Sequence, residues 1–573
     1  MARVRSSHTA PEAPAHDDVP QPQSWEQRLR GFGWAPRPRA GVRDRLVPPF
    51  PEPGTQLWQF FGVARPAAHR LARWVGWGGP LLVALVAGVL RFLRLDQPHA
   101  VIFDETYYAK DAWSLLQHGY ETSWPEDANE KILAGTVPLT DTAAYVVHPP
   151  VGKWTIALGE WAFGMTPFGW RFMMAVLGTL SVLMLCRIGR RLFRSTALGC
   201  LAGLLMAVDG LHLVMSRTAL LDLVVMFWIL AAFGCLLVDR DRTRARLAAA
   251  LPTSPDGLLR PDARTGARLR LGLRPWRVLA GISLGLAFAT KWNALYVLAA
   301  FGLLLVLWDV AARRTAGAPR PVRSVLRRDA LPAFTSLVPV ALVVYVASWV
   351  GWLTTSGGYY RDWAATSGAD SGHTWIPEAL RSLWHYSSEV YRFHVGLTSE
   401  HTYESHPWSW LVVGRPVSYF YESSEQGEDG CAHASGCATE VLALGTPVLW
   451  WAACFALGYA LYRWLFRRDW RAGAVLCGVA AGYLPWFLYQ ERTIFSFYAV
   501  VLVPFLCLAV AMMAGALLGP PGCRERRRAA GIVVSGLLVL AVAWNFVYFY
   551  PLYTGMELPL DSWRTRMWLR TWI

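Results

Sequence analysis

The sequence predicts an all-α polytopic membrane protein with about eleven transmembrane helices. Its 573 residues are 54% hydrophobic and only 17% charged, with a mean hydropathy of +0.28, whereas a soluble domain typically carries about 25% charged residues. Apolar runs of membrane-spanning length recur along the chain. Arginines gather in short blocks between these runs, as in the cytoplasmic loops of polytopic proteins. This distribution assigns the net charge of +15 to membrane topology and predicts no nucleic-acid partner.

The individual spans follow from a scan for runs of about 17 to 25 apolar residues. We expect spans near 78–95, 170–188, 197–215, 218–238, 276–290, 293–311, 331–352, 446–466, 472–489, 494–518 and 530–550. The fifth and sixth spans are separated only by "KWN", so they are expected to form a tight hairpin.

The orientation follows from the charges of the connections. The long 96–169 loop holds three Lys/Arg against ten Asp/Glu, and the 353–445 loop holds four against eleven. The connections that alternate with them, including 239–275, are rich in arginine. Because positive loops stay in the cytoplasm, we expect a cytoplasmic N-terminus, an extracytoplasmic C-terminus and two large loops outside the cell. The expected location of the protein is the plasma membrane.

Residues 1–77 are rich in Pro and Arg and show little apolar periodicity. They are expected to form a disordered cytoplasmic tail, and not a signal peptide, since no short apolar core follows the initial charges. The membrane domain is then 78–573.

Two of the nine cysteines, Cys431 and Cys437, close the sequence "CAHASGC" in the second external loop. A short-loop disulfide is expected on this oxidising side of the membrane. A metal site that includes His433 is the less favoured alternative.

The segment "HAVIFDETYYAKDAW" (99–113) places two adjacent acids, Asp104 and Glu105, just after the first span. Acids at the start of a solvated loop are common. These two adjoin a membrane boundary, however, and neighbouring side chains on an extended segment point opposite ways. One carboxylate can therefore face a reaction centre while the other orients a substrate.

Four cations lie at external ends of spans, against the positive-inside trend: Lys291, Arg492, Arg217 and Arg171. Snorkelling of a long side chain to the interface explains an isolated case. Charges at this depth more often face the bundle interior or a pathway. Together with the external acids, the four cations predict a site for an anionic ligand at the outer leaflet.

Two further external segments carry candidate residues. "HPPVGKW" (148–154) contains His148 and Lys153, two prolines that prevent helix formation and a glycine, Gly152, that allows close approach of another chain or ligand. A tight turn is the simpler explanation.

The segment "HTYESHPWSWLVVGRPVSYFYE" (401–422) alternates aromatic and polar residues. It fits an amphipathic element lying on the membrane or a lid above the site.

Six motifs occur in an order that resembles one family, the protein O-mannosyltransferases of the shorter, actinobacterial type. They are "FDETYYAKDAW", "HPPVGKW", "WRF", "SRTALLD", "TKWNALY" and "ERTIFSFY". The 401–422 segment is also similar to the second-loop signature of the bacterial members. The resemblance covers about residue 78 to the C-terminus and excludes the tail.

The resemblance implies a GT-C glycosyltransferase fold with two large extracytoplasmic loops and juxtamembrane helices. Such enzymes transfer mannose from polyprenyl-phosphate-mannose to Ser or Thr of secreted or membrane proteins, with inversion at the anomeric carbon. The acceptors are expected during secretion, at the Sec translocon. Eukaryotic members carry a β-trefoil domain in the second loop, and residues 353–445 are too few to contain one.

The resemblance also implies roles for the candidate residues. Asp104 is the expected general base, and Glu105 is expected to position acceptor or sugar. The donor phosphate is expected to bind Lys291, Arg492 and either Arg171 or Arg217. His148 and Lys153 are expected to shape the acceptor channel. The residues expected to border the site from above are His401, Glu404 and Trp408. Asp222 is expected to pair with Arg217. No obligatory cofactor is expected: many GT-C enzymes use a divalent metal ion, and here the cations are expected to replace it.

Two rival functions remain. Another GT-C transferase would pass a lipid-linked sugar to a glycolipid or a cell-wall glycan. A transporter or flippase for an anionic lipid would also place cations inside the bundle, but it would make no covalent product.

Overall fold

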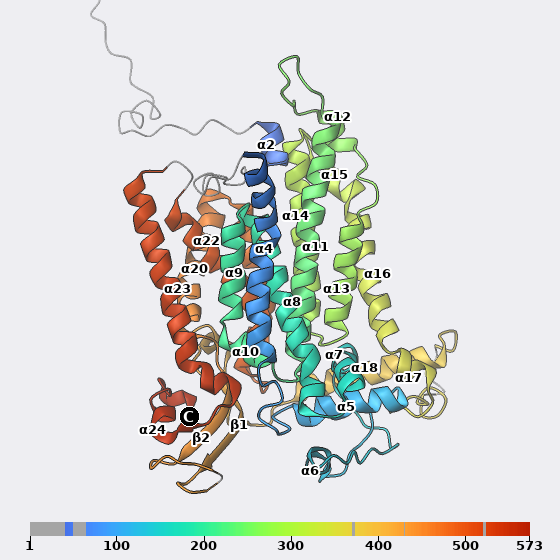
Figure 1. Ribbon diagram of the computed structural model, residues 1–573. Coiled ribbons are helices and arrows are strands. Elements are labelled where there is room, and N and C mark those ends of the chain that lie inside the picture. The colour runs from blue at the N-terminus through green and yellow to red at the C-terminus, as the bar shows by residue number, and fades with distance from the viewer. Residues whose placement is uncertain (1–40, 50–64, 369–372, 429, 520–522) are drawn as a thin grey trace, which may run out of the picture.

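The computed structural model describes residues 41–49, 65–368, 373–428, 430–519 and 523–573. Long, roughly parallel helices form the body of the molecule (Figure 1). These helices are α4 (Arg65–Phe92), α8 (Pro167–Phe193), α9 (Thr196–Ala207), α11 (Leu221–Ala250), α13 (Pro275–Phe288), α14 (Ala294–Thr315), α16 (Ala330–Ser348), α20 (Pro447–Arg467), α21 (Trp470–Tyr483), α22 (Val503–Leu518) and α23 (Glu525–Thr554). The predicted helical membrane bundle is confirmed.

Eight helical segments of the described chain are long and apolar enough to cross a membrane. Three shorter apolar helical segments complete the set: residues 76–92 of α4, the whole of α9 and the whole of α13. Each of the eleven predicted spans falls on one of these segments. Exposed Leu, Val and Trp side chains cover the outward faces of α4 and α23, which is the surface that lipid chains solvate. The chain is therefore a multi-pass membrane protein.

The centre of the bundle is α22, which packs against α9, α20, α21 and α23 and has most of its residues buried. Phe505 of α22 lies edge-to-face with Phe233 of α11 at 5.2 Å between ring centroids, and Phe233 contacts Phe301 of α14 at 5.8 Å. These rings fix three helices around one apolar core.

The two ends of the bundle carry different elements (Figure 1). At one end lie α5 (Glu105–His118), α6 (Ala128–Leu133), α7 (Val151–Phe163), α10 (Gly210–Met215), α17 (Val350–Thr354), α18 (Glu378–Gly396), α24 (Leu560–Arg564) and the C-terminus. The short helix α19 (Pro407–Trp410) follows α18 in the chain. At the other end lie α2 (Val42–Leu46), α12 (Ala263–Arg268) and α15 (Pro321–Arg328). Both acidic loops thus gather at one end, and the arginine-rich connections gather at the opposite end.

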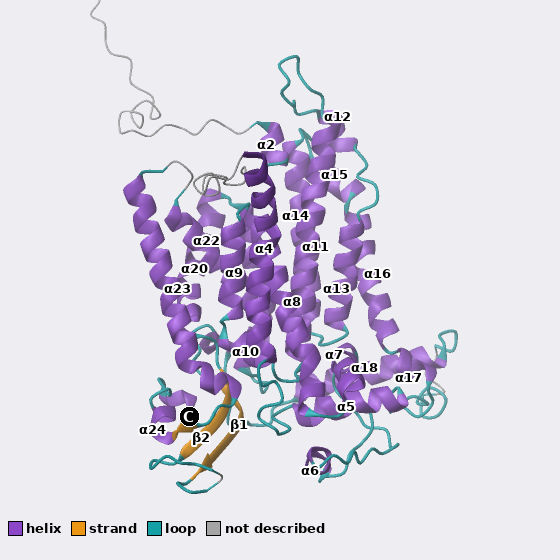
Figure 2. Cartoon of the chain, in the orientation of Figure 1, coloured by secondary structure: helices purple, strands orange, loops and turns teal. Residues whose placement is uncertain are grey.

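A three-stranded antiparallel sheet at the acidic end departs from the all-α prediction (Figure 2). Its order is β1 (Val417–Ser424), β2 (Cys437–Ala443) and β3 (Leu558–Pro559). Part of the segment expected to lie on the membrane is therefore strand β1. The hairpin loop between β1 and β2 is closed by the predicted Cys431–Cys437 disulfide, with an S–S distance of 2.01 Å.

Two boundaries differ from the sequence-based expectation. The 239–275 connection begins as helix, because α11 continues to Ala250, and Arg274 bridges Asp239 and Asp309 at 2.5–3.1 Å. The predicted 197–215 span is interrupted between α9 and α10. There Asp209 caps α10 through the backbone N–H of His212 at 2.9 Å, which fixes the break.

The expected disordered tail, 1–77, is in part ordered. Residues 1–40 and 50–64 lie outside the described residues. Residues 42–46 form α2, where Leu46 is buried and the Arg45 carbonyl accepts a hydrogen bond from Arg244 at 3.0 Å. Helix α4 begins at Arg65, so the last part of the expected tail belongs to the first long helix.

Candidate active site

The two acids that follow the first long helix diverge at the start of α5. The preceding residue, Phe103, has a left-handed backbone with φ of 48°, an uncommon and strained conformation for an aromatic residue. Asp104 then occupies the N-cap position of α5, and Glu105 is its first helical residue. Asp104 is partly exposed, whereas Glu105 is fully buried.

Glu105 forms a buried ion pair with Arg171 of α8. Arg171 Nε and Nη2 donate to the two carboxylate oxygens at 2.8 and 2.9 Å, and the Ala219 N–H donates to the same carboxylate at 3.0 Å. The remaining guanidinium donors reach the carbonyl oxygens of Pro98 and Ala100 at 2.9 and 2.8 Å. Both side chains are thus engaged with the protein itself, which differs from the substrate-contacting roles expected for them.

Arg217 also differs from its expected role. Its guanidinium donates to the carbonyl oxygens of Arg91, Leu93 and Arg94 at 2.9, 2.7 and 2.7 Å. These carbonyls end α4, where a helix has no internal donors left. Arg217 therefore caps α4 and holds the chain that leads to Asp104.

The expected Asp222–Arg217 pair is wrong, because Asp222 pairs with Lys291. The Lys291 ammonium lies 2.7 Å from the Asp222 carboxylate. Asp222 lies in the first turn of α11, and Lys291 lies in the turn between α13 and α14. The pair ties these helices together, and both residues line a large cavity.

Asp104 lies within electrostatic reach of this pair. Burial raises the pKa of the Asp104 carboxyl to about 6; the Lys291 charge opposes this effect, the Asp222 charge adds to it, and a hydrogen bond from Tyr108 lowers the value. A carboxyl with this pKa is largely ionised at neutral pH and close to the value that suits a general base.

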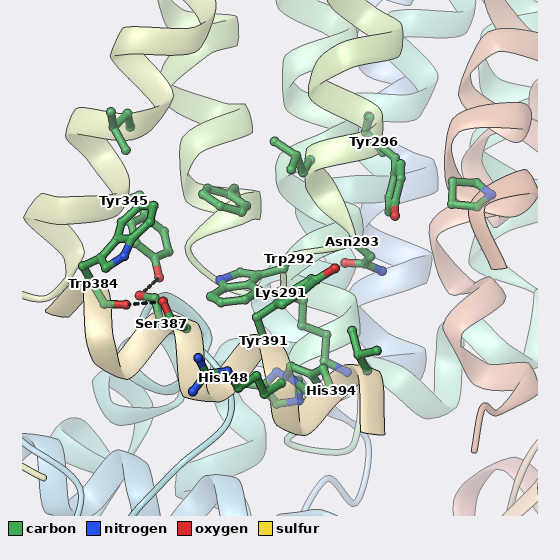
Figure 3. A pocket seen from close by; sticks show the side chains of 18 of the residues that line it. His148, Lys291, Trp292, Asn293, Tyr296, Tyr345, Trp384, Ser387, Tyr391 and His394 are labelled. Carbon is green, nitrogen blue, oxygen red and sulfur yellow. Dashed lines mark hydrogen bonds between the residues drawn. The ribbon is translucent and has the colours of Figure 1, made fainter. Parts of the chain in front are cut away.

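The cavity has a volume of about 1380 Å³. Its walls come from α11, α13, α14, α16 and α18 and from the 481–501 stretch. Aromatic and aliphatic side chains, such as Tyr345, Leu342 and Trp384, form most of the lining. Lys291, His148 and His394 lie together at one end, beyond these rings (Figure 3). The cavity thus joins an apolar channel to a polar, cationic end.

Arg492 shares this cationic end. One Nη atom lies 3.2 Å from His394 Nδ1, and His394 Nε2 lies 2.7 Å from the carbonyl oxygen of Val147. His394 must donate from Nε2 to that carbonyl, so its Nδ1 accepts from Arg492. Burial, together with the nearby Arg492 and Lys291 charges, lowers the pKa of His394 to about 4, although the bond to Val147 opposes this. Arg492 Nε is buried and has no hydrogen-bond partner within the described part of the chain, so its N–H can donate to a ligand.

The "HPPVGKW" segment contributes one residue to the cavity. The ring of His148 is stacked on that of His394 at 5.1 Å between ring centroids. Lys153, in contrast, is fully buried in an ion pair with Glu121 and does not line the cavity. Gly152 permits close packing, since a Cβ there would lie 2.6 Å from the Leu221 side chain.

The candidate residues of the 401–422 segment lie away from the cavity. His401 lies edge-to-face with Phe495 at 5.0 Å between ring centroids. Glu404 and Trp408 are exposed and line no part of the cavity. The ring of Tyr419 in β1 is stacked on that of Phe103, with 4.6 Å between the ring centroids. Tyr419 therefore brings a side chain of the 401–422 segment next to the residue that precedes Asp104.

Three residues of the site were missed by sequence reasoning. Tyr108 lies one helical turn after Asp104, a spacing that brings both to the same helix face. His394 is one of two histidines in the amphipathic helix α18. Tyr498 follows "ERTIFSF", and its ring centroid lies 5.0 Å from the Lys291 ammonium. Only Tyr108 carries a spacing signal that could have identified it. Within the described ranges, no three His, Cys, Asp or Glu side chains gather into a possible metal site.

Two protein families match the chain in sequence. Residues 81–347 match the family described as dolichyl-phosphate-mannose-protein mannosyltransferase. Residues 379–572 match the C-terminal four-transmembrane region of protein O-mannosyltransferase. The two matches include Asp104, Lys291, His394 and Arg492.

Full-length relatives and a solved structure agree with this assignment. The chain is 41% identical to the polyprenol-phosphate-mannose–protein mannosyltransferase of Mycolicibacterium smegmatis, over 88% of this chain and 94% of the relative. It is 34% identical to the enzyme of the same name in Corynebacterium glutamicum, over 86% and 92%. In structure it resembles the Saccharomyces cerevisiae protein O-mannosyltransferase Pmt1–Pmt2 complex bound to the sugar donor, with a TM-score of 0.64, 15% identity and coverage of 86% and 92%.

Proposed function

Because this chain belongs to the dolichyl-phosphate-mannose–protein mannosyltransferase family, we infer that it transfers mannose from polyprenyl-phosphate-mannose to hydroxyl groups of proteins. It is a membrane glycosyltransferase with the GT-C fold.

The site faces the extracytoplasmic side of the cell membrane in this proposal. Asp104 is the N-cap of α5, which lies at the end of the bundle that carries the two acidic loops. Lys291 and Arg492 line the cavity together with residues of α18, which lies at the same end. The opposite end carries the arginine-rich connections and the start of α4. The positive-inside rule places that basic end, with the N-terminus, in the cytoplasm and the C-terminus outside.

The cavity fits the lipid-linked donor. Its apolar channel between α14, α16 and α18 suits an isoprenoid chain, which needs no polar partner. Lys291 and the unpaired Nε of Arg492 supply positive charge and a hydrogen-bond donor for the phosphate. The mannose then lies beyond the phosphate, toward Asp104.

The transfer is a single in-line displacement. An acceptor Ser or Thr oxygen forms a bond to the anomeric carbon as the bond from that carbon to the phosphate oxygen breaks. Asp104 takes the hydroxyl proton, which a neutral hydroxyl must lose to become an effective nucleophile. The pair of electrons leaves with the polyprenyl phosphate, whose charge Lys291 and Arg492 stabilise. One displacement inverts the configuration at the anomeric carbon.

The other expected site residues act through these groups. Glu105, Arg171 and Arg217 hold the turn between α4 and α5, and thereby orient Asp104. His148 and His394 shape the phosphate end of the cavity. We assign the phosphate to Lys291 and Arg492 without an obligatory divalent ion, because these two cations already provide the charge that the leaving group needs.

The acceptors proposed are Ser- or Thr-containing segments of secretory and membrane proteins. A site on the outer face meets such chains as they leave the Sec translocon. An unfolded segment at that stage exposes the hydroxyl groups that a folded domain would cover.

The observation that carries this proposal is the position of Asp104, a carboxylate with a raised pKa beside the Lys291–Asp222 pair of the cationic cavity. The test uses membranes that contain the full chain, radiolabelled polyprenyl-phosphate-mannose and a Thr-containing peptide. Asp104→Asn is compared with Asp127→Asn, which changes an exposed carboxylate of the same loop.

We expect mannose transfer to the peptide by the wild type and by Asp127→Asn, and a loss of at least about a hundredfold in Asp104→Asn. Absence of transfer by folded wild-type protein would contradict the protein-acceptor function. Full activity of Asp104→Asn would keep the function but remove Asp104 as the base.

A further inference from the structure

One edge of the small sheet is unpaired at the acidic end of the molecule. The sheet order is β1-β2-β3, so β1 pairs with β2 on one side alone. On its other side, the backbone groups of residues 417–423 have no backbone partner among the described residues. Tyr421, Glu422 and Ser423 are exposed. An edge of this kind is a template for pairing with another extended chain.

The inner end of β1 lies beside the proposed base. Tyr419 of β1 is buried and stacked on Phe103 at 4.6 Å between ring centroids and 13° between ring planes. Phe103 directly precedes Asp104 in the chain. From Tyr419 the strand runs outward to the exposed Ser423, a distance of about 13 Å at roughly 3.3 Å per residue. Val417 and Tyr419 are buried, so the part of the edge that is open to another chain is 421–423. A chain paired there can continue along β1 toward Tyr419, and its next residues then reach the neighbourhood of Asp104.

The edge lies apart from the proposed donor site. No residue of β1 lines the large cavity, whose walls come from α11, α13, α14, α16, α18 and the 481–501 stretch. The lipid-linked sugar and a chain on β1 can therefore reach Asp104 from different sides. In-line displacement requires such an arrangement, since the nucleophile approaches opposite to the leaving group.

We propose that the acceptor polypeptide binds as an added strand on the free edge of β1 and presents its Ser or Thr hydroxyl to Asp104. This inference rests on the proposed function and names the conformation of its acceptor. Backbone hydrogen bonds supply the affinity in strand addition. The enzyme thus accepts many sequences, provided that the segment is extended, and rejects the same residue within a helix.

The charge of the strand region refines the acceptor class. Residues 417–428 contain Glu422, Glu425 and Glu428 and no Lys or Arg. Acidic residues in the paired part of an acceptor would meet like charges across the pair, which is unfavourable. The preferred acceptor is therefore an extended segment without acidic residues next to its Ser or Thr.

The test uses the wild-type full chain in membranes and a peptide with one Thr in a segment without acidic residues. Matched peptides carry three backbone N-methyl groups on alternate residues, placed either before or after the Thr. For each side of the Thr, two peptides are made, one methylated at the odd positions and one at the even positions; these are the two phases. In a strand, alternate N–H groups point to opposite sides. One phase therefore blocks the groups that face β1, and the other phase leaves them intact.

On one flank, we expect one phase to raise the KM for the peptide at least about tenfold, through lost backbone hydrogen bonds, and the other phase to change it less than about threefold. Equal KM values for the two phases on both flanks, whether both normal or both raised, would overturn the strand-addition proposal. Failure of the unmodified peptide to accept mannose would instead contradict the proposed function, so the two failures are distinguishable.

Discussion

Asp104 and Glu105 are adjacent in the chain, yet their carboxylates occupy different environments. Asp104 is partly exposed at the N-cap of α5, near Lys291 and Asp222. Glu105 is fully buried against Arg171, with 2.8 Å between Oε1 and Nε. The pair thus divides into a group that can meet a substrate and a group that holds the local structure. Substitution of each residue should separate catalysis from folding.

Glu105→Gln should reduce stability. Removing one partner of a buried ion pair typically costs about 3–5 kcal/mol, since the other charge remains buried and unpaired. We expect a lower yield and a lower Tm for the detergent-solubilised protein, measured by thermal unfolding. Asp104→Asn serves as the matched control and should keep the wild-type Tm. Equal Tm values for Glu105→Gln and the wild type would contradict the structural role.

The activity should depend on the protonation of Asp104. Burial raises its pKa from 3.8 to about 6, and the base works only when it is ionised. The kcat/KM for the peptide should therefore be constant above about pH 7 and should fall about tenfold per pH unit below pH 6. Initial rates between pH 5 and pH 8 measure this profile. A rate that stays constant down to pH 5 would show that the titrating base lies elsewhere.

Lys291→Met should lower kcat/KM about a hundredfold, the usual scale for loss of one group that stabilises a developing charge. It also leaves the buried Asp222 carboxylate without its partner. The double variant Lys291→Met/Asp222→Asn should therefore recover Tm but not activity. Transfer rates and thermal unfolding of the three proteins separate the two effects. Recovery of activity in the double variant would remove Lys291 from the phosphate site.

His394→Phe should weaken donor binding. The substitution removes the Nδ1 acceptor that holds Arg492 at 3.2 Å, so the guanidinium loses its orientation toward the phosphate. We expect the KM for polyprenyl-phosphate-mannose to rise about fivefold to tenfold, with the KM for the peptide unchanged. His394→Gln, which retains an acceptor oxygen, should have the smaller effect. An equal rise in both KM values would indicate a general loss of structure.

Chelation of divalent ions should leave the transfer active. Lys291 and Arg492 supply the positive charge at the proposed phosphate site, so the reaction needs no metal for this purpose. Transfer rates in membranes treated with EDTA should agree with untreated rates within about twofold. Loss of activity that Mg²⁺ or Mn²⁺ restores would contradict this assignment and would add a metal ion to the site.

The sequence predicted the membrane body well, since an apolar run of spanning length has few alternative structures. It also brought forward Asp104, Lys291 and Arg492 as candidates. It could not separate Lys291 from Arg171, because both are cations at an outer helix end. The difference lies in neighbours that are distant in the chain: Arg171 meets Glu105 and the carbonyls after α4, while Lys291 faces the cavity.

Strand β1 was missed for a related reason. The sequence "VSYFYESS" alternates aromatic and polar residues, a pattern that fits a membrane-surface element or a half-buried strand. The strand exists because residues 437–443 return beside it after the disulfide-closed loop. His394 gave no signal either, as its role depends on Arg492, which lies 98 residues away in the chain.

Residues 558–572 complete the three-stranded sheet and hold the segment that precedes it. β3 pairs with β2 at Pro559 and Cys437, and Trp572 is buried with its indole N–H on the Val413 carbonyl at 2.8 Å. Assembly of this region must therefore wait until residues 558–572 have been translated. The protein gains this finished surface late in its own synthesis, after all the long helices have been made.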